Sequence, residues 1–195
     1  RSLATLLVAG DGGQDKVRPI VDHYWGEWKP GEYRASIPAE PPQEAPRTAE
    51  IAWPTPTLPW LAVAFHAPAF SDHDPDWAAL NVLSYLGFSE NSHIYRKLVI
   101  QEQKVDMLDA DIVAGPDPFL FTVTARIKKP EDVRYVTAQV QSTLEKFSNT
   151  AVEKEELEAG KQHPRDGYSL SLTNPQSLAA TAPLWPPTPP APERG

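Results

Sequence analysis

The sequence contains no cysteine, which excludes a disulfide framework and a metal site built on thiolates. No apolar run approaches the ~20 residues that span a bilayer, and the apolar stretch near the N-terminus is too short for a signal peptide. Basic residues are scarce: 18 lysines and arginines face 26 aspartates and glutamates, for a net charge of −8. Because nucleic-acid affinity comes mainly from clustered cations, we expect a soluble protein that binds no nucleic acid. Many exported bacterial proteins also lack cysteine, so cytoplasm, periplasm and secretion all stay open.

The motifs of common catalytic sites are missing as well. Zinc hydrolases usually place two histidines one helical turn apart beside a glutamate, yet neither H-E-x-x-H nor H-x-x-E-H occurs. There is no G-x-S-x-G or S-x-x-K to supply a nucleophile, and no glycine-rich phosphate loop. No stretch of the sequence is therefore an active site by itself.

Proline is the one residue in clear excess, at 22 of 195 positions. Eight prolines lie from Pro30 to Pro59, and six fall in the tail 183–195. Because proline lacks an N–H and has a fixed φ, we expect an extended linker over 36–57 and no regular structure in the tail.

Between these proline-rich stretches, the hydrophobic pattern predicts helices and strands. A buried strand over 59–70 is followed by a helix with Asp74 as its N-cap and Pro75 as its first residue. The later elements expected are an amphipathic helix within 91–106, antiparallel strands over 104–115 and 118–129, and helices over 130–149 and from 151 onward. This order predicts an α+β fold in which helices pack on one face of a largely antiparallel sheet.

Two further segments have their own expectations. Residues 3–13 are typical of a strand and a turn, and a helix should follow over 14–28. The helix that begins after residue 151 should be interrupted by Pro164 and Gly167.

The densest group of chemically capable side chains is "HAPAFSDHD", which contains His66, Asp72, His73 and Asp74. Imidazole and carboxylate groups are zinc ligands, so this group is a candidate for metal binding or catalysis. Its irregular spacing favours a structural interpretation, in which His66 ends a strand and the aspartates cap the next helix.

The highly charged stretch "NSHIYRKLVIQEQKVD" presents a similar choice between catalysis and structure. Its apolar residues recur at helical spacing and should hold the helix to the sheet: Ile94, Tyr95, Leu98 and Val99. Arg96 then falls on the solvent-facing side, where it is a weak candidate for catalysis.

Several segments match a known pattern in both order and spacing. They are "ATLLVAGD", "IVDHYWGEW", "IPAEPPQ", "AFHAPAFSDHDPDWAALNVLSYLGF", "IYRKLVIQEQKV" and "EKEELEAGKQ". Together they resemble the M16 metallopeptidases, the pitrilysin, insulinase and mitochondrial-processing-peptidase group, over residues 3–181. The resemblance implies the LuxS/MPP-like α+β half-unit of that family.

In this family, one half-unit binds zinc through H-x-x-E-H and a distant glutamate. A second, similarly folded half-unit lacks the metal and helps to close a peptide-cleaving chamber. The resemblance implies that residues 1–35 end a first half-unit and that residues 58–182, after the linker, form most of a metal-free one. This chain is then expected to hold no cofactor, and zinc belongs to a portion upstream of Arg1.

Many members use an arginine and, seven residues later, a tyrosine of the metal-free half-unit to contact the scissile region of the substrate. Aligning "LVIQEQKVD" on this motif places Val99 at the arginine position and Asp106 at the tyrosine position. An aliphatic side chain donates no hydrogen bond to a developing oxyanion, and a carboxylate repels it. The resemblance therefore implies that this substrate contact is absent and that no residue of the chain is catalytic.

Two functions remain open. One is an inert structural unit of a zinc-dependent endopeptidase, which contributes chamber wall and a strand edge for extended peptides. The other is an assembly subunit of a non-peptidase relative, similar to the respiratory-complex core proteins. The expected partners are a catalytic M16 half-unit, in the same chain or in another subunit, and a peptide substrate. Self-association of the chain is also open, because an isolated half-unit exposes a face that a partner normally covers.

Overall fold

The chain divides into two compact units. The computed structural model describes residues 6–29, 31, 38, 41–71, 73–115, 117–173 and 175–181. One unit comprises Trp53–Leu170, and the other combines Arg1–Ala52 with Ser171–Gly195. The first of these units contains the β-sheet and its covering helices.

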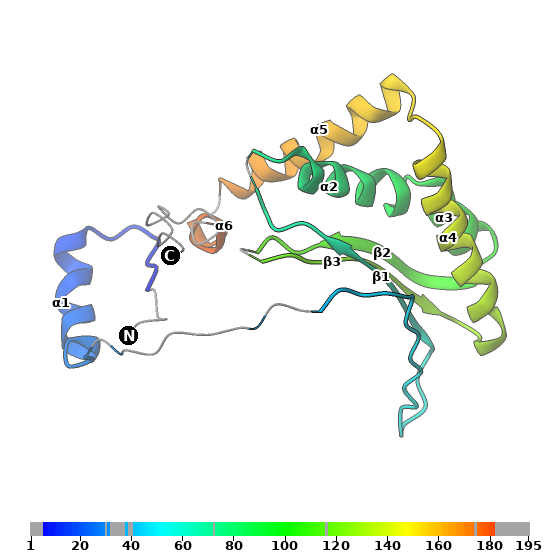
Figure 1. Ribbon diagram of the computed structural model, residues 1–195. Coiled ribbons are helices and arrows are strands. Elements are labelled where there is room, and N and C mark those ends of the chain that lie inside the picture. Colours follow the sequence, from blue (N-terminus) through cyan, green and yellow to red (C-terminus); the bar gives the residue numbers. More distant parts are fainter. Residues whose placement is uncertain are drawn as a thin grey trace. The chain divides into compact units, whose positions relative to one another are not determined.

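Strands and helices of this unit form an α+β fold, as the sequence predicts (Figure 1). Its strands are β1 (Trp60–Ala67), β2 (Val105–Ile112) and β3 (Phe119–Ile127). Its helices are α2 (Pro75–Phe88), α3 (His93–Tyr95), the π-helix η1 (Arg96–Gln101), the 3-10 helix η2 (Pro130–Asp132), α4 (Val133–Asn149) and α5 (Lys154–Ser171).

The sheet is antiparallel throughout, with the strand order β1-β3-β2. Along β3, "FLFTVTARI" alternates buried and less buried side chains, so every second residue points to the same face. On that face Phe121 lies opposite Phe65 of β1 and Ile112 of β2. The central strand therefore determines which face of both neighbours points to the core.

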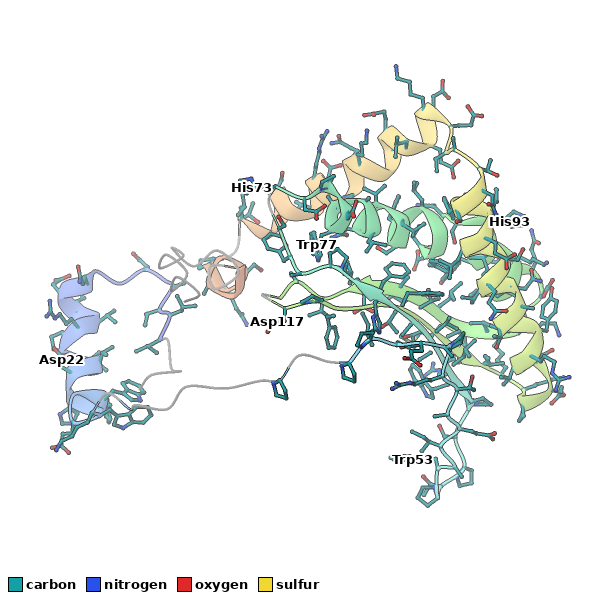
Figure 2. All side chains as sticks on the ribbon, in the orientation of Figure 1. Asp22, Trp53, His73, Trp77, His93 and Asp117 are labelled. Atoms are coloured by element: carbon teal, nitrogen blue, oxygen red, sulfur yellow. The ribbon has the colours of Figure 1, made fainter. Side chains whose placement is uncertain are left out.

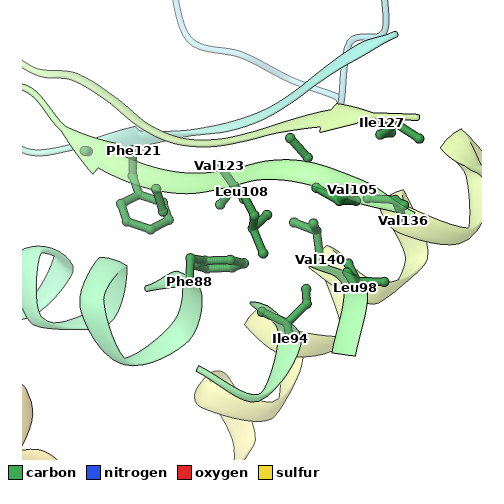
Figure 3. Close-up of a cluster of buried hydrophobic side chains, with 13 residues drawn as sticks. Phe88, Ile94, Leu98, Val105, Leu108, Phe121, Val123, Ile127, Val136 and Val140 are labelled. Carbon is green, nitrogen blue, oxygen red and sulfur yellow. The ribbon is translucent and has the colours of Figure 1, made fainter. Parts of the chain in front are cut away.

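Helices cover this face of the sheet. Phe88 of α2, Leu98 of η1 and Val140 of α4 are all fully buried against it (Figure 3). Burying one large apolar side chain contributes roughly 1.5–3 kcal/mol. The complete buried cluster is Ala67, Phe88, Ile94, Leu98, Val105, Leu108, Ala110, Phe121, Val123, Ala125, Ile127, Val136 and Val140.

α2 begins where the sequence predicts. The Asp74 backbone is extended, and its carboxylate accepts a hydrogen bond from the backbone N–H of Asp76 at 2.9 Å. Pro75 is the first helical residue, where a backbone N–H would have no partner within the helix. The predicted cap is confirmed.

Two expectations for this unit are wrong. α5 continues without a break through Pro164 and Gly167, because a proline removes one helical hydrogen bond while the neighbouring turns keep theirs. The strand expected to be buried is β1, which lies at an edge of the sheet and alternates exposed with half-buried side chains over most of its length. Its exposure follows from its place at the edge, which the local sequence does not encode.

In the other unit, α1 (Gln14–Trp25) forms within the predicted helical segment, and α6 (Pro175–Thr181) lies near the C-terminal end of the described chain. The described part of the predicted strand, residues 6–13, contains no strand, so that expectation fails there. Within 36–57, the described positions form neither helix nor strand. The tail 183–195 lies outside the described residues.

α5 approaches α2 closely at one glycine. A Cβ atom on Gly160 would lie 2.7 Å from Leu86 Cδ2 and 2.8 Å from Leu86 Cγ, well inside van der Waals contact. About two turns further along the same helix, a Cβ atom on Gly167 would have no neighbour within 4 Å. The close approach therefore depends on the missing side chain at position 160 alone.

We expect Gly167→Ala to stabilise the chain by up to about 1 kcal/mol, because alanine favours the helix. Gly160→Ala gains the same propensity but pushes Leu86 aside, and overpacking costs about 1–3 kcal/mol. We therefore expect a net loss of stability for Gly160→Ala in urea unfolding followed by circular dichroism. Equal stabilisation by the two substitutions would show that the helices are not in close contact at position 160.

Candidate functional site

The charged stretch 91–106 contains a short helix that begins after Ser92. The Ser92 hydroxyl is buried and accepts a hydrogen bond from the backbone N–H of Tyr95 at 3.2 Å. The four residues predicted to hold the helix to the sheet are buried or half-buried in the core: Ile94, Tyr95, Leu98 and Val99. The predicted amphipathic helix is confirmed.

The second half of this helix is wound as the π-helix η1. The Glu102 N–H donates to the carbonyl of Lys97, five residues earlier, at 2.9 Å. Gln103 then adopts a φ of 52°, in the left-handed region that side chains other than glycine rarely occupy. The Lys104 N–H donates to the Leu98 carbonyl at 2.9 Å, and β2 follows directly. This tight exit joins the helix to the strand without a loop.

Val99 stands where the family resemblance places an arginine. Its side chain is half-buried and packs against the hydrophobic core. A branched hydrocarbon has no hydrogen-bond donor to offer a substrate. The absence of a substrate contact at this position stays a prediction. The structure shows instead that Val99 packs against the core.

Asp106 stands at the tyrosine position and lies on β2, where the register shifts between Val105 and Met107. Its carboxylate accepts hydrogen bonds from Nε and Nη2 of Arg126 on β3, at 2.8 and 3.1 Å. These hydrogen bonds hold the pKa of Asp106 below its usual range and raise the pKa of Arg126. The carboxylate is thus engaged within the chain.

Arg126 also connects this ion pair to the opposite edge of the sheet. Its guanidinium carbon lies 5.6 Å from the ring centroid of Trp60, the residue directly opposite on β1. Trp60, Arg126 and Asp106 therefore form a row across all three strands. The sequence does not single out Arg126 or Trp60, because the row depends on strand register and on the shift between Val105 and Met107.

The cations of the charged stretch attach it to α4 and η2. Lys97 Nζ donates to Gln139 Oε1 at 2.7 Å, and Lys104 forms an ion pair with Asp132. The two ammonium groups lie 5.6 and 5.5 Å from the centroid of the Tyr135 ring. The hydrogen bond to Asp132 raises the pKa of Lys104. Lys97 and Lys104 therefore attach the charged helix to α4 and η2.

The weaker candidates lie on different elements. His66 is exposed on β1 opposite Leu120, and Arg96 is exposed on η1. His73 precedes α2, and its backbone N–H donates to the Ser71 hydroxyl at 3.1 Å. Asp72 lies outside the described residues. Among the described residues, no contact brings these candidates into one catalytic group.

Figure 2 shows His73 and His93 at opposite ends of α2. Within the described ranges, no group of three or more His, Cys, Asp or Glu side chains is placed to hold a metal ion. Zinc, which the family resemblance implies for the preceding half-unit, has no matching ligand set in this part of the chain. None of the described helices combines the length and apolar character needed to cross a membrane.

Among the described residues of the unit Trp53–Leu170, two surfaces could contact other molecules. The first is the sheet face opposite the core, formed by Trp60, Ala62, Ala64, His66, Leu120, Thr122, Thr124, Arg126, Met107, Asp109 and Asp111. The second is a groove of about 630 Å³ between α2, α4 and α5, with mainly apolar walls that include Ala78, Val82, Leu86, Leu144, Phe147 and Leu157.

We expect Asp106→Asn to remove part of the pH dependence of stability. The lowered pKa of Asp106 means that its ion pair stabilises the fold above the ordinary value of 3.8 and that this stabilisation is lost as pH falls through the lower folded-state pKa. Urea midpoints at low ionic strength should therefore differ between wild type and Asp106→Asn near neutral pH. They should converge as the pH falls through the folded-state pKa of Asp106, below 3.8.

Asp109→Asn is the matched control, because Asp109 lies on the same strand and, within the described part of the chain, forms no ion pair. It should leave the pH dependence close to that of wild type. Parallel curves for wild type and Asp106→Asn at every pH would contradict a stabilising role for the pair with Arg126.

Solved structures similar to this chain are longer than it is. A protease from Helicobacter pylori matches with a TM-score of 0.73 and 22% identity, covering 88% of this chain and 42% of that one. A protein described as an M16-like peptidase from Alicyclobacillus acidocaldarius matches with a TM-score of 0.55 and 20% identity, over 64% of this chain and 29% of that one. A chain of complex III2 from Candida albicans matches with a TM-score of 0.52 and 14% identity, over 63% of this chain and 31% of that one.

At these identities the likenesses establish a shared fold, and the chain spans less than half the length of each of these structures. No curated protein sequence is significantly similar to it. The family model described as "Peptidase M16 inactive domain" matches residues 1–163. The match covers most of the chain and agrees with the α+β fold of the M16 structures. The chain belongs to the peptidase M16 inactive domain family.

Proposed function

We propose that this chain is a metal-free, non-catalytic part of a zinc-dependent M16 endopeptidase, in which it forms wall of the peptide-cleaving chamber. The match to the inactive domain over residues 1–163 is the observation that carries this proposal. The sequence supports it, because it has no H-x-x-E-H motif. The larger size of the similar structures supports a partner unit that supplies the zinc.

The two family contact positions support an inert role for this unit. Val99 packs against the core, and Asp106 is held in a two-point ion pair with Arg126. A substrate carbonyl gaining negative charge would find neither a donor at the first position nor a neutral phenol at the second. In this proposal, the groups that stabilise the transition state come from another unit.

The proposal divides the chain into four parts. Residues 1–35 end a preceding half-unit, 36–57 link it to the next, 58–182 form most of a metal-free half-unit, and 183–195 are a tail. The clustering of the sheet and its helices within Trp53–Leu170 supports this division. The zinc-binding portion lies upstream of Arg1.

A second candidate function is an assembly subunit without peptidase activity. The likeness to a chain of complex III2 from Candida albicans favours it, because that chain shares the fold and belongs to a multi-subunit complex. The side chains at Val99 and Asp106 fit this role equally well. The parent sequence upstream of Arg1 separates the two functions. An intact H-x-x-E-H motif followed by a distant glutamate there would support the peptidase and would exclude a protein that serves only in assembly.

We expect the chain by itself to bind no stoichiometric zinc in isothermal titration calorimetry. We also expect it to leave an unstructured fluorogenic peptide uncut, with or without a chelator, because it lacks both the zinc ligands and the donors for an oxyanion. Binding of about one zinc per chain, together with cleavage that a chelator abolishes, would refute a non-catalytic role. A preparation of thermolysin, treated in parallel, verifies that peptide and chelator work as intended.

A further inference from the structure

We infer that the end of the charged helix is a two-state joint, in which residues 97–104 exchange between the observed π winding and an α winding. Three uncommon backbone features meet where this helix leads into β2. η1 is a π-helix, a winding that fewer than about 1% of residues adopt. Gln103 has a φ of 52°, and β2 carries an extra residue between Val105 and Met107. Strained backbone of this kind is often retained where a segment has two alternative conformations.

The Leu98 carbonyl is the group on which the two windings depend. In an α-helix it would accept a hydrogen bond from the backbone N–H of Glu102, four residues later. In the structure it accepts one from the Lys104 N–H at 2.9 Å. The Glu102 N–H donates instead to the Lys97 carbonyl, also at 2.9 Å. The Lys104 N–H therefore takes the place that the Glu102 N–H has in the α winding.

The backbone of Gln103 decides which N–H reaches this carbonyl. Its left-handed φ turns the chain back so that the Lys104 N–H meets Leu98, a turn that glycine usually makes at the end of a helix. Glutamine has a Cβ atom, which makes the left-handed conformation unfavourable for it. Return of Gln103 to a negative φ withdraws the Lys104 N–H from the carbonyl and leaves it to Glu102. The two hydrogen bonds therefore change together, which gives two states and no gradual bend.

The exchange leaves the hydrophobic core intact. Leu98 and Val105, the fixed points on either side of the joint, are both fully buried (Figure 3). The residues at positions 100–103, between them, are exposed. Rewinding therefore moves mainly exposed side chains and removes no large apolar group from the core.

Side-chain contacts with α4 and η2 hold the joint in the observed state. The Tyr135 hydroxyl donates to the Glu102 carboxylate at 2.9 Å, and Lys104 forms its ion pair with Asp132. Because the backbones of Glu102 and Lys104 both move in the exchange, loss of either contact favours the α winding. The joint therefore couples the attachment of α4 to the path of the chain into β2.

Gln103→Asn and Gln103→Thr form a matched polar pair that tests the joint. Asparagine tolerates a positive φ, whereas β-branched threonine opposes it. In Gln103→Asn, the Glu102 N–H should stay bound to Lys97. In Gln103→Thr it should bind Leu98, with the ratio of the two populations changed about tenfold or more. Scalar couplings across hydrogen bonds, measured by NMR on the full chain, identify the acceptor of each N–H.

The wild-type chain should exchange between the two states. Relaxation-dispersion NMR should detect microsecond-to-millisecond exchange at the amides of Glu102 and Lys104, and this exchange should be weaker in Gln103→Asn. Tyr135→Phe removes one contact of the observed state and should raise the population of the α winding while the joint itself keeps its sequence. Tyr24→Phe, on the exposed surface of α1, is the control and should leave both amides as in wild type.

Two outcomes would overturn the inference. The first is a wild-type chain without exchange at Glu102 and Lys104, together with an unchanged Lys97 acceptor in Tyr135→Phe. The second is the same acceptor for the Glu102 N–H in Gln103→Asn and Gln103→Thr. If circular dichroism shows that Gln103→Thr does not fold, the comparison of wild type with Tyr135→Phe decides the question by itself.

Discussion

The burial of alternate residues along β3 is the constraint on which the rest of this structure depends. β3 pairs on both sides, so the apolar side chains of Phe121, Val123 and Ile127 determine the covered face of the whole sheet. A slip of one residue would expose them and bring Thr122 and Thr124 into the core instead. The positions of the covering helices follow from that choice of face, because they are the elements whose apolar side chains complete the same cluster.

The charged helix after α2 illustrates how a sequence that looks catalytic is used for attachment. Its apolar side holds it to the sheet, and its cations reach the neighbouring helix, where Lys97 and Lys104 lie over the ring of Tyr135. The ion pair of Lys104 with Asp132 adds a contact over 28 positions of sequence. A partly exposed pair of this kind contributes little by itself, so the apolar contacts dominate and the polar ones orient the helix.

The chemistry of the two family contact positions follows from the same packing. Val99 belongs to the layer between helix and sheet, and Asp106 is turned by an irregularity of β2 toward Arg126. Both side chains are thus part of the internal structure of the unit. In a unit proposed to have no chemistry of its own, its surfaces matter more than its ionisable groups. Those surfaces are the sheet face opposite the core and the groove beside α2.

The sequence by itself determined the elements whose causes are local. Alternation of apolar residues predicted the β2–β3 hairpin, helical spacing predicted α2, the helix of residues 93–101 and α4, and Asp74 with Pro75 predicted where α2 begins. Each of these elements depends on residues only a few positions apart. The spacing of apolar residues and the capping residues are therefore enough to predict them.

Only the tertiary structure decided the features that join distant residues. β1 reads as a buried strand, yet its exposure depends on which strands flank it. The row of Trp60, Arg126 and Asp106 depends on the register of three strands. The physical reason is common to both. Contacts between separated segments add free energies that no local pattern contains, and these outweigh the intrinsic preferences of single residues.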